Sequence, residues 1–255
     1  MKRKQFLMLP TLIFLLTSMI CPAQKKEISI SVDPRFELVS TVCRLADFDE
    51  YNMSSYPDYY KAVGENFAEF KDHRAVRLIK KLRVEHSIAY NAPMGFASYM
   101  ESIDKLRPIV PMDHVAADLD QRWTPEAIAE FAKALQEFVT DTDFKVFLKE
   151  NEKRYEIAVK RFHEIVKEED PVLWFNNYFG TDAENDFQLV LGLQNGGANY
   201  GARATDSQGY TTLYSVIGCR AQDEDGMPEF SKRTVSTVIH EFCHSYTNPI
   251  VSASK

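Results

Sequence analysis

The sequence predicts an α+β protein, with a mostly helical first part followed by a small sheet and one last helix. Apolar residues recur at helical spacing up to about residue 170, which is the pattern of helices that bury one face. From residue 171 onward, dense apolar and β-branched segments alternate with glycine turns, which is typical of strands. An amphipathic stretch near the end predicts the last helix. We therefore expect residues 24–170 to form the helical part and residues 171–255 the part with the sheet.

The composition limits the class of protein. A hydrophobic fraction of 45 % is typical of a globular chain and too high for a disordered one. The formal net charge of −7 argues against a nucleic-acid partner, because no basic excess is available to neutralise phosphates. Three cysteines, Cys43, Cys219 and Cys243, follow the leader described next, and three thiols cannot all pair. A single bridge stays open, but a disulfide scaffold is excluded.

The first 23 residues have the layout of a secretory signal peptide. Three basic residues precede an apolar run over residues 6–20, and the small-residue stretch Cys21-Pro22-Ala23 follows. The run has 15 residues, fewer than the roughly 18 that a membrane-spanning helix needs. We therefore expect cleavage after Ala23 and a periplasmic or secreted protein without stable membrane insertion. The alternative is a membrane anchor formed by residues 6–20.

Helix-starting residues divide the first part into elements. Asp33-Pro34 and Thr124-Pro125 each combine a capping side chain with a proline that suits the first helical position. The predicted elements are a strand at 27–32, a helix from Asp33-Pro34, two helices within 57–83, an irregular stretch at 86–123, a helix from Thr124-Pro125, and a second helix from Asp141 to about Val166.

Strands alternate with turns in the second part. Residues 194–197 (Gln-Asn-Gly-Gly) form a hairpin-type turn, so the segments on either side are expected to pair. Residues 223–226 are read as a solvated acidic turn, because the remaining ligand spacing of a calcium loop is missing. The predicted elements are strands at 187–193, 200–204 and 211–219, and a final helix over 231–246 that Asn248-Pro249 should end.

The final helix carries the motif H-E-x-x-H at residues 240–244. Histidines four residues apart lie one above the other on a helix, so His240 and His244 can bind one zinc ion. Glu241 can then take a proton from a zinc-bound water and pass it to the leaving amine. On a helical wheel these three residues share one side, and Cys243 lies at the margin of the apolar face, where packing is expected. The apolar face consists of Val235, Val238, Ile239, Phe242 and Tyr246.

A third zinc ligand does not follow the motif. A catalytic zinc normally has three protein ligands and a water, but no Asp, Glu, His or Cys follows His244 up to residue 255. The metzincin pattern is excluded, because it requires glycine at Thr247 and histidine at Ile250. Either the sequence is a fragment and the ligand lies beyond residue 255, which we favour, or His86 or His114 supplies it. Residues 24–255 alone are then expected to bind zinc weakly.

The strand before the final helix has an expected role at the site. In zinc peptidases of this general build, an edge strand beside the metal pairs with an extended peptide substrate. Residues 211–219 are the predicted edge strand. Tyr200, Tyr210 and Tyr214 are upstream hydroxyls that could stabilise an oxyanion, although each is more readily explained as a packing residue.

Both ends of the chain resemble a family of exported bacterial proteins known as a domain of unknown function with an H-E-x-x-H motif. The resemblance rests on residues 31–38 (Ser-Val-Asp-Pro-Arg-Phe-Glu-Leu) with 44–46, and on residues 238–249. It implies a zincin-like catalytic part of the gluzincin type, with His240 and His244 as zinc ligands and Glu241 as the catalytic residue. It implies no particular substrate.

Together these observations predict a zinc metallopeptidase, a hydrolase that acts on a peptide or protein substrate. Two alternatives stay open. One is a non-catalytic exported binding or structural protein that has lost the metal site, and the other is a zinc hydrolase that acts on a non-peptide bond.

Overall fold

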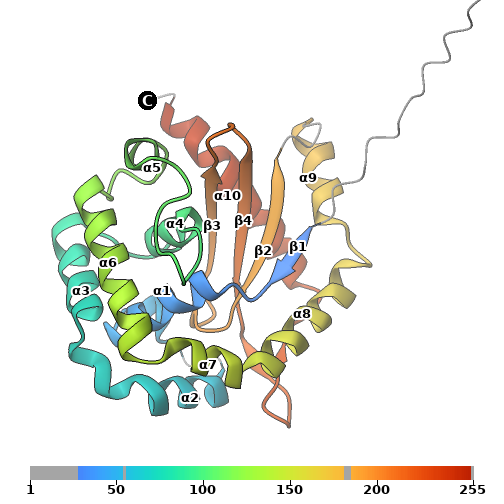
Figure 1. Ribbon diagram of the computed structural model, residues 1–255. Coiled ribbons are helices and arrows are strands. Elements are labelled where there is room, and N and C mark those ends of the chain that lie inside the picture. Colours follow the sequence, from blue (N-terminus) through green and yellow to red (C-terminus); the bar gives the residue numbers. More distant parts are fainter. Residues whose placement is uncertain (1–27, 54–55, 181–184, 254–255) are drawn as a thin grey trace, which may run out of the picture.

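The computed structural model describes residues 28–53, 56–180 and 185–253 (Figure 1). The predicted leader, residues 1–23, lies outside these ranges. Within them the chain forms a mixed α/β structure in which helices cover both faces of a small sheet. No helix of the described ranges is both long and apolar enough to cross a bilayer.

The main sheet has four strands in the order β1-β2-β4-β3. β1 runs parallel to β2, β2 runs parallel to β4, and β3 pairs antiparallel with β4 at the edge. β1 comes from the start of the chain, so both predicted parts contribute to one sheet and one core. The strands are β1 (Ser29–Ser31), β2 (Asp186–Gly192), β3 (Asn199–Thr205) and β4 (Thr211–Gly218), and a separate hairpin pairs β5 (Ala221–Gln222) with β6 (Pro228–Glu229).

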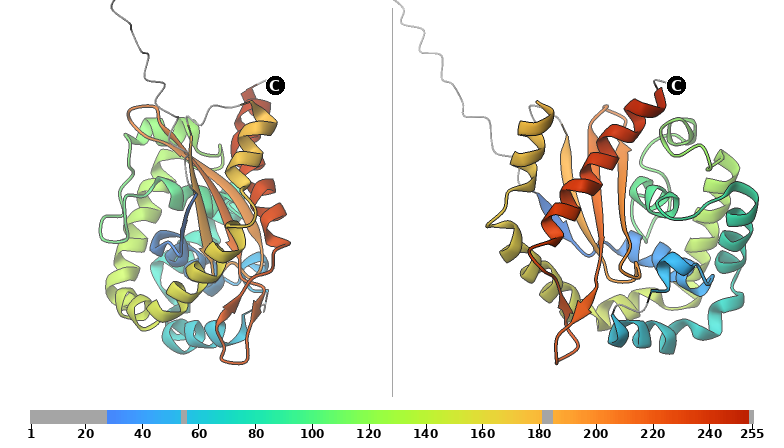
Figure 2. Two further views of the ribbon diagram at one scale, coloured as in Figure 1. Left: turned by 90° about the vertical axis from the view of Figure 1, so that its right-hand side faces the viewer. Right: turned by 180° about the vertical axis from the view of Figure 1, so that it is seen from behind.

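Ten helices of the described ranges surround this sheet. Figure 2 shows α9 and α10 on one face of the sheet and the helices of the first part mainly on the opposite face. The helices are α1 (Pro34–Leu45), α2 (Pro57–Phe67), α3 (Arg74–His86), α4 (Ala92–Tyr99), α5 (Met112–Asp118), α6 (Pro125–Asp141), α7 (Phe144–Glu150), α8 (Glu152–Val166), α9 (Pro171–Phe179) and α10 (Thr234–Ala253).

The two predicted helix starts are confirmed by their capping hydrogen bonds. The Asp33 carboxylate accepts from the backbone N–H of Arg35 at 2.9 Å, and the Thr124 hydroxyl accepts from that of Ala127 at 3.2 Å. Each cap satisfies one donor that the first helical turn leaves without a partner.

Several predicted boundaries were wrong. The stretch 86–123 is not irregular, because α4 and α5 lie within it. The long helix after Asp141 is interrupted at Asn151, which separates α7 from α8. α10 does not end at Asn248 but continues to Ala253. The helix runs through Asn248-Pro249, although an internal proline typically costs about 3 kcal/mol.

The predicted hairpin between β2 and β3 was also wrong. β4 lies between these two strands, and the hairpin of the main sheet joins β3 to β4 instead. Consequently β4 is an inner strand, and the predicted edge strand 211–219 is not at the edge. The edge beside the helices of the first part belongs to β3.

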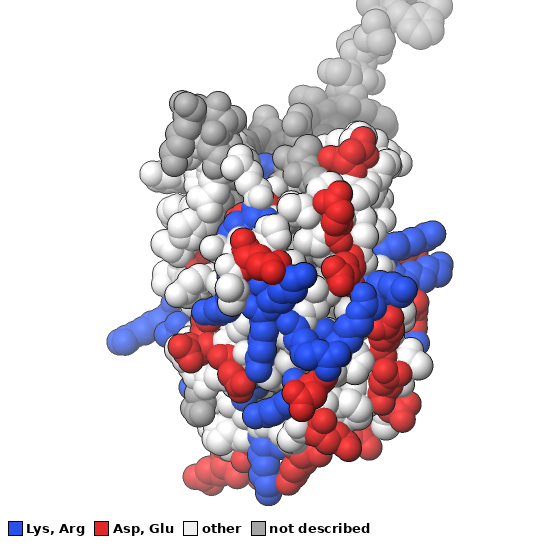
Figure 3. Space-filling model, turned by 90° about the vertical axis from the view of Figure 1, so that its left-hand side faces the viewer, with Lys and Arg blue, Asp and Glu red and all other residues white. Residues whose placement is uncertain are grey.

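Ion pairs join the helices on the side of the molecule shown in Figure 3, where basic and acidic side chains alternate. Arg74 at the start of α3 contacts Glu137 of α6 at 2.9 Å and Glu130 at 3.5 Å. These side chains are exposed to solvent, so such pairs add little to the free energy of unfolding.

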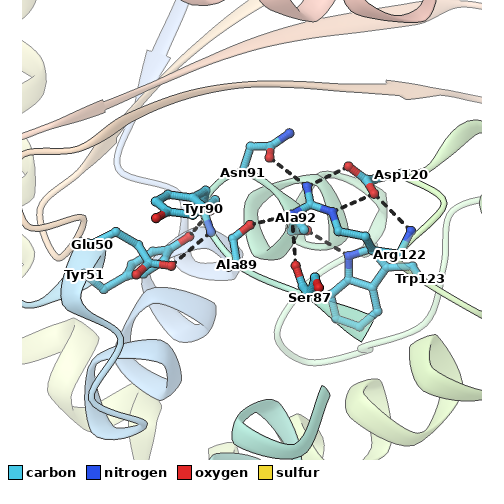
Figure 4. A network of polar contacts seen from close by, with 10 residues as sticks. All are labelled: Glu50, Tyr51, Ser87, Ala89, Tyr90, Asn91, Ala92, Asp120, Arg122 and Trp123. Carbon is cyan, nitrogen blue, oxygen red and sulfur yellow. Dashed lines mark hydrogen bonds and ion pairs between the residues drawn. The ribbon is translucent and has the colours of Figure 1, made fainter. Parts of the chain in front are cut away.

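A polar network fixes the segment between α3 and α4 (Figure 4). The Arg122 guanidinium donates to the carbonyls of Ser87 and Ala89, both at 3.1 Å. The Glu50 carboxylate accepts from the backbone N–H of Tyr90 at 3.0 Å. Ser87 and Tyr90 have positive φ angles of 56° and 57°, a conformation that costs energy without glycine. The hydrogen bonds of this network offset that cost.

A buried carboxyl group joins α1 to the end of β2. Glu37 is 1 % exposed and accepts hydrogen bonds from the Leu193 backbone N–H and the Tyr59 hydroxyl, both at 2.8 Å. Burial raises the pKa of Glu37 to about 7, although hydrogen bonds from Tyr59, Gln194 and the backbone act in the opposite direction.

This pKa predicts that stability depends on pH. The carboxyl binds its proton more tightly in the folded chain than in the unfolded chain, where the pKa is 4.5. Its contribution to the free energy of unfolding is therefore fully present below pH 4.5 and is lost as the pH rises to about 7. The loss is on the order of 3 kcal/mol. Denaturant unfolding of Glu37→Gln should show a flatter dependence on pH over this range than the unchanged chain. Glu156→Gln, which alters an exposed carboxylate of α8, is the control and should leave the slope unchanged. Equal slopes for all three proteins would contradict the prediction.

Candidate functional site

α10 crosses the back of the sheet diagonally and presents two faces (Figure 2). Val235, Val238 and Phe242 are buried, and the Phe242 ring packs edge-on against Phe187 of β2 at 5.1 Å between centroids. The Ser245 hydroxyl donates to the Tyr214 carbonyl of β4 at 2.7 Å. These contacts fix the rotation of the helix, so the opposite side of α10 faces solvent.

His240 and His244 are both exposed on that side, and their rings converge. The two Nε2 atoms lie 2.9 Å apart, and the ring centroids are 4.5 Å apart with the planes nearly perpendicular. Two imidazoles on one tetrahedral zinc ion have nitrogens about 3.3 Å apart, because each Zn–N bond is roughly 2.0–2.1 Å. A small rotation of either ring therefore gives the spacing that a shared ion requires, and the pair fits two of its ligand positions.

Glu241 lies differently from its two neighbours. The helical wheel places it on the same side as the two histidines, but Glu241 is only 7 % exposed, and its carboxyl group forms a hydrogen bond with the Gly201 backbone of β3. Burial raises the pKa of its carboxyl group, while the neighbouring His240 and His244 and a hydrogen bond with the Gly201 backbone act in the opposite direction. A carboxylate with a raised pKa is a better proton acceptor near neutral pH.

Gly201 of β3 allows this close approach. A Cβ atom at Gly201 would lie 2.5 Å from the Glu241 carbonyl oxygen, 2.8 Å from the Ser245 hydroxyl and 3.0 Å from the His244 Cβ. Real Cβ atoms do not come so close to other heavy atoms. The absence of a side chain at this one position lets the motif pack directly against the edge strand.

The outer edge of β3 is partly covered by α4. In an antiparallel pair, alternate residues direct their backbone groups away from the partner strand. At this edge the Arg203 carbonyl accepts from the Ser98 hydroxyl at 3.1 Å, and the Thr205 N–H donates to the Tyr99 hydroxyl at 3.1 Å. Asn199 and Gly201 belong to the same alternating set and lie beyond these contacts. A bound chain would therefore meet β3 near its beginning rather than along its whole length.

The structure brings no upstream histidine to the pair. Among the described residues, no three His, Cys, Asp or Glu side chains are placed to hold one metal ion. His86 ends α3 and His114 lies exposed on α5. Neither therefore serves as the third ligand considered from the sequence.

The tyrosine candidates for oxyanion stabilisation are not at the motif. Tyr200 stacks on Tyr51 at 5.8 Å, and Tyr214 packs against Phe36 of α1 at 5.5 Å, so both face the helices in front of the sheet. Tyr210 is exposed in the turn between β3 and β4. The packing interpretation therefore holds for Tyr200 and Tyr214. The three thiols outside the leader, those of Cys43, Cys219 and Cys243, are all free, and Cys243 is half-buried, as expected for a packing residue.

A cavity beside the motif was not predicted from the sequence. It has a volume of about 470 Å³ and lies at the start of α10, where Arg233 and Thr237 meet Asn199 and Arg220. Arg233 and Thr237 continue, at helical spacing, the stripe that carries Glu241 and His244. The helical spacing was a signal in the sequence, but only the fold brings Ala221 and Glu229 of the β5–β6 hairpin to the same cavity.

The comparisons with known proteins give one match. A family model described as "Domain of unknown function (DUF4932)" matches residues 28–254. Neither the curated proteins nor the solved structures contain a match to the chain.

Proposed function

The chain belongs to the DUF4932 family, and from this premise and the geometry of α10 we propose that the protein is a zinc-dependent peptidase with a zincin-like site. The expected resemblance to a family of unknown function is confirmed at that level. The family description carries no activity, so the proposal rests on the residues of the site.

One observation carries the proposal. Two exposed imidazoles converge to 2.9 Å between their Nε2 atoms, and the largely buried Glu241 lies beside them at the edge of a sheet. At this distance one Nε2 can donate a hydrogen bond to the other when no ion is bound, and the same convergence suits two ligands of one ion. His240 and His244 would hold the ion, and a bound zinc ion would supply Lewis-acid chemistry and lower the pKa of water.

The residues of this chain can perform the proton transfers of peptide hydrolysis. The Glu241 carboxylate accepts a proton from the attacking water and donates it to the amine that leaves when the C–N bond breaks. A hydrogen bond with the Gly201 backbone holds this carboxyl group between α10 and β3, and burial keeps its pKa raised. The substrate main chain would lie across the beginning of β3, near Asn199 and the Gly201 carbonyl.

Peptide cleavage in the presence of added zinc tests the proposal. Quenched fluorescent peptides of mixed sequence should be cleaved by the chain with excess zinc, and a chelator should stop the reaction. A protein that binds zinc at the pair but cleaves no peptide in such a mixture would contradict the peptidase assignment.

A further inference from the structure

The lining of the cavity at the start of α10 carries more positive than negative charge. Its lining includes Arg220, Glu229, Phe230, Arg233 and Thr237, from α10, β6 and the segments that flank the β5–β6 hairpin. The two guanidinium groups and the single carboxylate give this lining a net positive charge. The positive end of the α10 helix dipole adds to it.

Neither arginine is neutralised within the described part of the chain. The Arg220 Nε donates to the Gly197 carbonyl at 2.9 Å, which orients the guanidinium but leaves its charge unpaired. No ion pair of the described residues joins Arg220 or Arg233 to a carboxylate, Glu229 included. Guanidinium groups bind carboxylates through paired parallel hydrogen bonds, which makes them better suited to this ligand than lysine.

The cavity lies about as far from Glu241 as two residues of an extended peptide span. Thr237 precedes Glu241 by four helical residues, about 6 Å along the axis. Asn199, which also lines the cavity, precedes Gly201 by two strand residues, roughly 6.6 Å. Both paths correspond to about two residues of an extended peptide. A peptide cleaved beside Glu241 would therefore place a side chain or its chain end, two residues from the cleaved bond, at the cavity.

We propose that this cavity is a substrate subsite that binds a carboxylate of the peptide about two residues from the cleaved bond. The inference deepens the proposed function and rests on it. The carboxylate is either an Asp or Glu side chain or the free carboxylate at the end of the peptide. Phe230 and the threonine methyl group offer apolar contact for the carbon atoms that carry it.

Peptide binding to an inactive protein tests the subsite without cleavage. The Glu241→Gln protein is titrated, with fluorescence anisotropy as the readout, with labelled peptides of one length. One peptide has an internal Glu and an amidated end, one has Gln and a free carboxylate, and one has Gln and an amidated end. We expect at least one carboxylate peptide to bind about 10–100-fold more tightly than the uncharged one, since a charge-assisted hydrogen bond contributes roughly 1.5–3 kcal/mol. The two carboxylate peptides distinguish the two sources.

Adding Arg233→Gln or Arg220→Gln should remove most of this preference. Lys232→Gln is the control, because it removes a positive charge next to Arg233 but does not line the cavity and pairs instead with Glu168. Equal affinity for charged and uncharged peptides, or equal effects of Lys232→Gln and Arg233→Gln, would overturn the subsite. If the cavity binds charged peptides selectively but the unchanged protein cleaves no peptide, the peptidase assignment is overturned and carboxylate binding at the cavity is supported. If peptides are cleaved without a preference for charge, the peptidase assignment is supported and carboxylate binding at the cavity is overturned.

Discussion

Glu241→Gln should reduce peptide hydrolysis by about 10²–10⁴-fold while zinc binding at the pair is retained. The amide has nearly the same shape as the carboxyl group but cannot accept a proton, and general acid–base catalysis contributes roughly this factor. The loss should appear in kcat more than in KM, because the side chain acts on the proton rather than on substrate binding. Initial rates with excess zinc measure it.

A second carboxylate provides the control for Glu241. Glu224→Gln changes an acidic residue of the exposed β5–β6 turn and should leave the rate within a few-fold of the unchanged chain. Unfolding curves of both variants check that the fold is retained. A Glu241→Gln protein that keeps most of its activity would remove Glu241 from the proton transfers and leave the site without a base.

Gly201→Ala should separate the motif from the edge strand. Its Cβ atom would lie 2.5 Å from the Glu241 carbonyl oxygen, and a backbone atom cannot move aside as the end of a flexible side chain can. α10 must then shift away from β3, at a cost of about 1–3 kcal/mol in the free energy of unfolding. The same shift exposes the Glu241 carboxyl group to water, so activity should fall more than stability alone explains.

Gly64→Ala is the matched control for Gly201. Gly64 lies in α2 with no heavy atom within 4 Å of an added Cβ, and alanine there should stabilise the helix by up to about 1 kcal/mol. Denaturant unfolding compares the two variants directly. If Gly201→Ala unfolds at the same denaturant concentration as the unchanged chain and keeps its activity, the close packing of α10 on β3 does not position the site.

The sequence correctly predicted the helix starts that depend on neighbouring residues. Asp33 and Thr124 cap the helices that they were expected to cap, because a cap depends only on the next three residues. The motif lies on a helix for a similar reason, since its apolar stripe has a clear helical period.

The strands of the main sheet were predicted close to their observed bounds, but their pairing and one buried helix were not. Gly196 and Gly197 do form a turn, with φ angles of 60° and 83°, but the segment that pairs with β2 is β4 rather than the strand that follows the turn. α4 was missed because it is buried nearly all round, Met94, Phe96 and Tyr99 included, and therefore shows no polar face. Of the site, the sequence indicated the three motif residues, but the contact with Gly201 and the arginine-lined cavity required the fold.

The central claim is that His240 and His244 bind one divalent ion together, and NMR of the imidazole groups during a zinc titration tests it most directly. We expect the rings of both residues to shift at the same zinc concentrations. The response should saturate only above micromolar zinc, because the described residues supply two ligands where a tight site has three or four. His240→Ala should abolish the response of His244. Rings that do not respond to zinc, or a His244 response that survives the loss of His240, would contradict a shared metal site.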